Sequence, residues 1–125
     1  MLVSNFAREV ATQGLRTATT AAPARAMSLG LGADALQMAV KDLSQLRQLG
    51  GDELARATRE IPANLQLGAV ALELHGSPAV RHLATALFKD ADQFIASGRT
   101  DGVISHAAKG YGTLMSAVAA RGLRA

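Results

Sequence analysis

Residues 77–97 read SPAVRHLATALFKDADQFIAS and predict the most regular element of the chain. Ser77 is a favoured N-cap residue, and Pro78 suits the first helical position because no helix bond needs its missing N–H there. Apolar side chains then recur at intervals of three and four residues up to Gly98: Val80, Leu83, Ala84, Leu87, Phe88, Ala91, Phe94 and Ile95. This spacing is typical of an amphipathic α-helix with one buried face.

The residues before this helix predict further helices that are separated by glycine and proline. Asp34 is expected to cap a helix that ends at Gly50–Gly51, and Asp52 to cap a short one that stops before Pro62. Pro62 is then expected to open a helix whose residues 63–74, ANLQLGAVALEL, are apolar on nearly every side. A helix of that kind belongs in the middle of a bundle or in an interface.

The two ends of the chain also predict helices. A first helix is expected over residues 3–20, followed by a linker or broken helix because Pro23, Gly30 and Gly32 interrupt the pattern. A last helix is expected to start at Thr100 or Asp101. Its expected apolar face consists of Val103, Ile104, Ala107, Tyr111, Leu114, Met115 and Val118.

Together these elements predict an all-α protein, a compact bundle of five to six short helices. We expect one domain over residues 1–125, with an N-terminal helix and linker in 1–33 and the core bundle in 34–125. Apolar residues make up 49% of the chain and aromatic residues only 3%, so small aliphatic side chains must fill the core. No stretch alternates apolar and polar residues as a half-buried strand would.

The composition excludes several function classes. The absence of cysteine excludes disulfides, thiolate metal sites and cysteine nucleophiles. No apolar run reaches the roughly 20 residues that cross a bilayer, and the N-terminus lacks a signal-peptide pattern. His75 and His82 have no companion ligands at metal spacing, and Asp90 and Asp92, two apart on a helix, are expected to be solvated. We therefore expect a cytoplasmic protein that is not an enzyme, with no cofactor, no metal and no membrane contact.

The basic residues are candidates for contact with nucleic acid. The net charge is +3, and residues 34–92 hold six bases and eight acids, so the excess of positive charge lies towards the two ends. Without aromatic residues among them, these bases are expected to contact phosphate rather than to stack on nucleotide bases. The candidate contacts are Arg56, Arg59, Arg99, Lys109, Arg121 and Arg124. An ordinary solvated helix surface is the alternative interpretation of each.

His106 is a candidate for covalent chemistry. The segment SHAAKGYGTL, residues 105–114, places lysine and glycine three and four residues after it. The helical period puts His106 about 120° from the expected centre of the apolar face, so it is predicted to be exposed. The segment resembles the signature of histidine phosphotransfer domains. That resemblance implies a phospho-acceptor role for His106, with Lys109 steadying the phosphoryl charge and Gly110 letting a receiver domain approach.

A longer stretch resembles another family. Residues 56–76, RATREIPANLQLGAVALELHG, followed by the helix expected at 78–97, resemble the small helical subunits of CRISPR effector complexes. The resemblance implies a non-catalytic filament subunit, and it carries Arg56 and Arg59 over as nucleic-acid contacts. The chain departs from the family in its scarcity of aromatic residues and in the long segment before the Ile61–Pro62 step.

Three functions remain open at this point. The first is an accessory subunit of a larger nucleoprotein assembly, which binds other proteins or copies of itself and contacts RNA or single-stranded DNA. The second is a histidine phosphotransfer protein. The third is a helical virion or assembly protein without a ligand.

Overall fold

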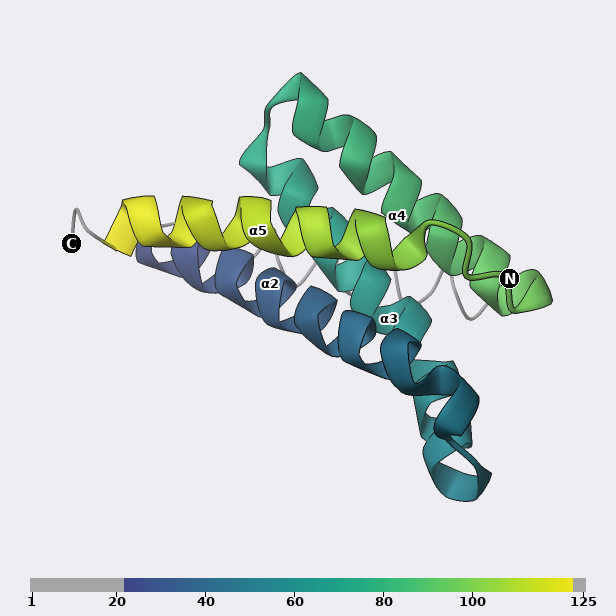
Figure 1. Cartoon of the computed structure of the whole chain (residues 1–125). Coiled ribbons are helices and arrows are strands. Elements are labelled where there is room, and N and C mark those ends of the chain that lie inside the picture. Colours follow the sequence, from purple (N-terminus) through teal and green to yellow (C-terminus); the bar gives the residue numbers. More distant parts are fainter. Residues whose placement is uncertain (1–21, 123–125) are drawn as a thin grey trace.

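The computed structural model describes residues 22–122 of the chain, with side-chain surroundings for residues 28–120. The described residues form four α-helices, a short 3-10 helix and no strand, so the protein is all-α (Figure 1). The α-helices are α2 (Ala22–Gln45), α3 (Gly51–His75), α4 (Pro78–Ser97) and α5 (Val103–Gly122), and the 3-10 helix η1 (Leu46–Gln48) lies between α2 and α3.

Helix α3 lies at the centre of the bundle and contacts each of the other three α-helices. Helices α2 and α5 run side by side across one face of α3, and α4 packs on α3 beyond them (Figure 1). In the second half of α3, the residues Leu65, Gln66, Gly68, Ala69, Val70, Ala71 and Leu72 are all buried. This confirms the prediction that the all-round apolar segment lies inside a bundle.

The ends of α4 confirm the predicted start and stop signals. The Ser77 hydroxyl oxygen accepts a hydrogen bond from the Val80 amide at 3.3 Å, and Pro78 occupies the first helical position. Gly98 ends the helix in the left-handed region, at φ 71°, where glycine is favoured. Helix α5 begins slightly later than predicted, at Val103, after Gly102 with φ 73°.

Two predicted breaks are wrong, which corrects the expected five to six short helices. The expected linker up to residue 33 is helical from Ala22, and Asp34 lies inside α2 rather than at its start. Pro62 lies inside α3 and separates no helices, and the N-cap of α3 is Gly50 rather than Asp52. The helix expected over residues 3–20 lies outside the described residues.

Packing explains why both breaks are overridden. Proline inside a helix costs roughly 3 kcal/mol because it removes a backbone hydrogen bond. In α3, however, the buried residues Ala57, Ile61 and Leu65 continue one apolar line across Pro62. In α2, Leu29 and Ala33 are fully buried core residues within the expected linker. Burial of such side chains contributes about 1.5–3 kcal/mol for each leucine or isoleucine, which offsets the local penalties.

Glycines let three helices approach closely. A Cβ atom built on Gly68 of α3 would overlap the Leu36 side chain of α2, and one on Gly32 of α2 would overlap the Ala71 side chain of α3. A Cβ on Gly110 of α5 would lie only 2.7 Å from a Leu36 methyl carbon. Leu36 therefore packs where the backbones of α3 and α5 leave room for it.

None of the helices in the described range combines the length and the apolarity that a bilayer-spanning segment requires.

Substitution of Gly68 by alanine tests this close approach. We expect Gly68→Ala to lower the free energy of unfolding by about 1–3 kcal/mol, because the new methyl group overpacks Leu36. The matched control is Gly112→Ala on α5, where a Cβ meets no atom within 4 Å. That control should raise the free energy of unfolding by about 0.5–1 kcal/mol, since alanine favours helix. Urea denaturation followed by circular dichroism measures both, and equal effects of the two variants would contradict the packing described.

Candidate functional site

A short polar contact between side chains joins α4 to α5. The Nδ1 atom of His106 lies 2.7 Å from the Oδ2 atom of Asp90. An ionised carboxylate can only accept a hydrogen bond, so Nδ1 carries the hydrogen and donates it. The Nε2 atom of the neutral ring then keeps its lone pair, which is the form that acts as a nucleophile or a base.

The two partners differ in exposure. The Asp90 side chain is 8% exposed and the His106 side chain 38%. The prediction of a solvated Asp90 is therefore wrong: this carboxylate lies at the α4–α5 contact, where the histidine supplies its hydrogen bond. Asp92 is exposed as predicted and also has an interaction partner.

His106 is less exposed than predicted because the buried face of α5 is rotated. The buried residues of α5 are Val103, Ala107, Gly110 and Leu114. At about 100° per residue, their centre lies about 70° from His106, whereas the expected centre near Tyr111 lay about 120° away. Tyr111 is only half-buried. The sequence pattern missed this rotation because Gly110 carries no side chain that marks it as apolar.

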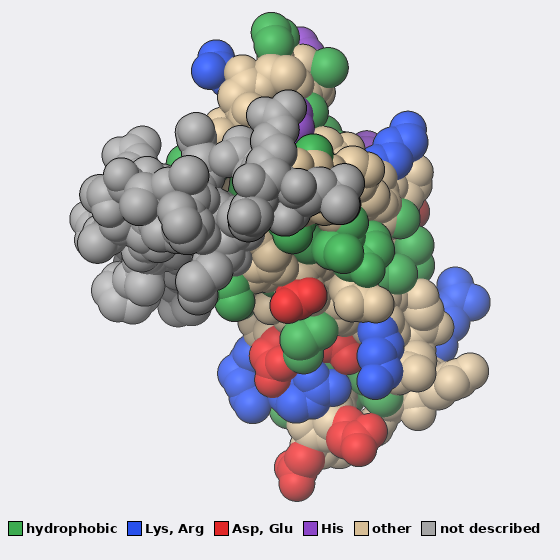
Figure 2. Space-filling model, turned by 90° about the vertical axis from the view of Figure 1, so that its left-hand side faces the viewer, with side chains coloured by type: hydrophobic (Ala, Val, Ile, Leu, Met, Phe, Trp, Pro, Cys, Tyr) green, Lys and Arg blue, Asp and Glu red, His purple; other side chains and the backbone are tan. Residues whose placement is uncertain are grey.

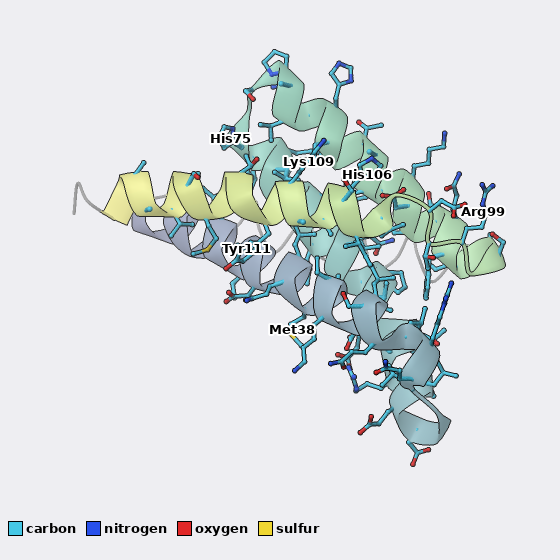
Figure 3. The ribbon with its side chains drawn as sticks, in the orientation of Figure 1. Met38, His75, Arg99, His106, Lys109 and Tyr111 are labelled. Carbon is cyan, nitrogen blue, oxygen red and sulfur yellow. The ribbon has the colours of Figure 1, made fainter. Side chains whose placement is uncertain are left out.

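Gly110 is therefore a packing residue. A Cβ at this position would lie within 3.5 Å of methyl carbons of Leu36, Leu72 and Leu87. The implied role of Gly110, to let a receiver domain approach, is corrected: the glycine faces the core and not the solvent. Lys109 is exposed, and Figure 3 shows it projecting from α5 on the same side as His106.

Two of the predicted nucleic-acid contacts are engaged by acidic residues. The Arg56 guanidinium lies 3.3 Å from a carboxylate oxygen of Asp42 and 3.2 Å from one of Glu60. The hydrogen bond and the negative charge of Asp42 raise the pKa of Arg56 above its usual value. Arg99 lies 3.3 Å from the carboxylate of Asp101 in an exposed ion pair.

The other predicted contacts divide into two groups. Arg59 on α3 and Lys109 on α5 are exposed and form no ion pair with a described residue. The side chains of Arg121 and Arg124 lie outside the described surroundings. The structure does not bring Arg59 and Lys109 together, because Arg59 lies in the first half of α3 and Lys109 on the α4 side of α5.

Sequence reasoning missed a set of exposed apolar side chains. Leu31 and Met38 on α2 are 59% and 49% exposed, and Ile104 and Met115 on α5 are each 40% exposed. Ile104 and Met115 were expected on the buried face of the last helix, and the rotation of α5 turns them outward. The seven-residue spacing of Leu31 and Met38 was a signal that these two share one side of a helix.

The metal expectation concerns His75 and His82, which lie at the end of α3 and near the start of α4. Over the described residues, no group of three or more histidine, aspartate or glutamate side chains is arranged to hold a metal ion.

Searches of protein-family models, curated proteins and solved structures found no match to this chain.

A double-mutant cycle measures the strength of the contact between α4 and α5. For Asp90→Ala and His106→Ala, we expect a coupling of about 1–2 kcal/mol, because each single change leaves a partly buried polar group without its partner. The exposed Arg99–Asp101 pair provides the control, with an expected coupling of a few tenths of a kcal/mol. Urea denaturation of the six variants gives both values, and a coupling for Asp90–His106 no larger than the control would contradict a structural contact.

Proposed function

We propose that this protein is a non-catalytic helical subunit of a larger nucleoprotein assembly. The observation that carries the proposal is the division of α5 into two exposed flanks. Ile104, Tyr111 and Met115 lie on one side of its buried face, and His106 and Lys109 lie on the other. One helix therefore offers an apolar surface for a protein partner and a basic surface for a polyanion.

The apolar side chains support protein assembly. Isolated exposed apolar residues are common, but large ones that recur along two neighbouring helices favour a binding surface. Leu31 and Met38 on α2 and Ile104 and Met115 on α5 meet this description. Figure 2 shows hydrophobic side chains gathered at mid-height on one face of the molecule, above a region rich in charged side chains. Copies of the chain and other proteins are both candidate partners.

The basic residues support contact with RNA or single-stranded DNA. Lys109 is exposed and forms no ion pair with a described residue, so a phosphate group has access to it. The likeness to CRISPR small subunits is supported by the all-helical content of the described residues. It draws no support from Arg56, which two acidic residues engage, nor from the Ile61–Pro62 step, which lies within one helix. A cytoplasmic location stays a prediction.

Salt-dependent binding tests this function. We expect the full chain to bind a labelled single-stranded oligonucleotide, with an affinity that falls about 20-fold between about 50 and 200 mM salt if it contacts about three phosphates. Fluorescence polarisation measures the affinity at each salt concentration. An uncharged peptide nucleic acid of the same sequence is the control and should not bind.

Binding that is equally tight at low and high salt would contradict phosphate contact. Absence of binding at low salt, together with self-association in sedimentation measurements, would favour the helical assembly protein without a ligand.

A second function is favoured by the hydrogen bond between Asp90 and His106. We propose as an alternative that His106 accepts a phosphoryl group on Nε2. Asp90 holds the Nδ1 hydrogen, so the Nε2 lone pair attacks phosphorus while the bond from phosphorus to the donor's aspartyl oxygen breaks. The freed carboxylate stays with the donor, and the Nδ1 hydrogen stays on the ring. Lys109, three residues further on, can approach the transferred phosphoryl oxygens.

Incubation with a phosphorylated receiver domain tests this alternative. We expect mass spectrometry to find phosphate on the wild-type chain and none on His106→Gln. The control His82→Gln changes an exposed histidine of α4 and should accept phosphate as the wild type does. An unphosphorylated wild type, or equal labelling of His106→Gln, would exclude His106 as the acceptor.

A further inference from the structure

We propose that the nucleic-acid strand lies along one face formed by α4 and α5, and not along the first half of α3. This α4–α5 face is defined by His82 and Lys89 on α4 and by His106 and Lys109 on α5. The inference rests on the proposed nucleoprotein function and names the surface that performs it. It differs from the sequence-based prediction, which placed two of six contacts on α3.

The helical period places these four residues on adjoining surfaces. Asp90 faces α5, since it bonds to His106. Lys89 lies one residue before Asp90, and His82 lies eight residues before it. At 100° per residue, both side chains lie about 80–100° around α4 from Asp90, in the same direction. His82 and Lys89 are exposed, as is Lys109. On α5, Lys109 lies about 60° beyond His106, and both project towards the α4 side (Figure 3).

The α5 part of the α4–α5 face has no acidic residue on its own helix. Helix α5 contains no aspartate or glutamate between Val103 and Gly122. The carboxylate of Asp90 is buried and engaged by His106. Asp92 lies about 200° from Asp90 around α4, directed away from α5, but only about 60° from Lys89 and one turn further along, so it borders the α4 part of the face. The positive charge of Lys109 is therefore not attenuated by a carboxylate of its own helix, whereas Asp92 partly offsets that of Lys89.

The first half of α3 has the opposite character. Arg56 is held by Asp42 and Glu60, and two further acids, Asp52 and Glu53, lie in the first turn of α3. Figure 2 shows acidic and basic side chains intermixed over this lower part of the molecule. A phosphate that approached Arg59 there would also meet this negative charge, which weakens its binding.

The face favours phosphate contact over base stacking. The aromatic residues of the described range are Phe88 and Phe94, which are buried, and Tyr111, which lies on the apolar flank of α5. Lysine binds phosphate as a flexible point charge without a fixed geometry. The half-buried side chains of Gln93 and Thr113 lie on the same sides of α4 and α5 and add uncharged donors. Binding along this face is expected to be independent of sequence.

Charge reversals in the full chain test this surface. We expect Lys89→Glu and Lys109→Glu each to weaken binding of a labelled single-stranded oligonucleotide about 5- to 10-fold at low salt. Lys109→Gln should reduce the slope of log affinity against log salt by about 0.7, the loss of one phosphate contact. The matched control is Arg59→Glu, which makes the same change in net charge on α3 and should weaken binding less than about 2-fold. Circular dichroism establishes that each variant is folded.

The outcomes separate this inference from the proposed function. Loss of binding in the two lysine variants with little effect of Arg59→Glu supports the α4–α5 face. Equal weakening by all three charge reversals, or weakening by Arg59→Glu alone, overturns the face while the nucleoprotein function stands. A wild type that does not bind the oligonucleotide at low salt overturns both.

Discussion

The packing of Leu36 between two glycines determines how close three of the helices lie. Its side chain occupies the space that a Cβ on Gly68 of α3 or Gly110 of α5 would need. Gly32 makes a second close approach of α2 to α3, opposite Ala71. Protein interiors are packed densely enough that an added methyl group finds little room. This is why a chain with almost no aromatic residues can still form a continuous core.

The same contact sets the rotation of α5 and hence the exposed chemistry of the molecule. Because Gly110 must face Leu36, the buried line of α5 runs through Ala107 and Leu114 and not through Tyr111. This rotation brings His106 to the side that meets α4, where the Asp90 carboxylate accepts its Nδ1 hydrogen. It also turns Ile104 and Met115 towards solvent. One steric constraint thus determines both flanks on which the proposed function depends.

The charge that each helix face presents depends on which basic side chains form salt bridges as well as on where they lie in the chain. Arg56 and Arg99 each have an acidic partner, while Lys89 and Lys109 have none among the described residues. The net charge of +3 does not show this difference, because it counts a neutralised arginine and an unpaired lysine alike. The electrostatic potential near each helix face therefore differs from the potential that a count of charged residues along the chain implies.

The sequence by itself determined the all-α class, the limits of α4 and the burial of the second half of α3, because these follow from periodicity and capping within short segments. The continuity of α2 and α3 could not be read from it, since glycine and proline are local signals that burial against other helices overrides. Of the candidate site, the sequence located His106 and Lys109 but not Asp90, which is 16 residues away along the chain. Only the tertiary structure decided which carboxylate meets the histidine and which arginines are already paired, because such contacts depend on helix rotations set by packing between distant residues.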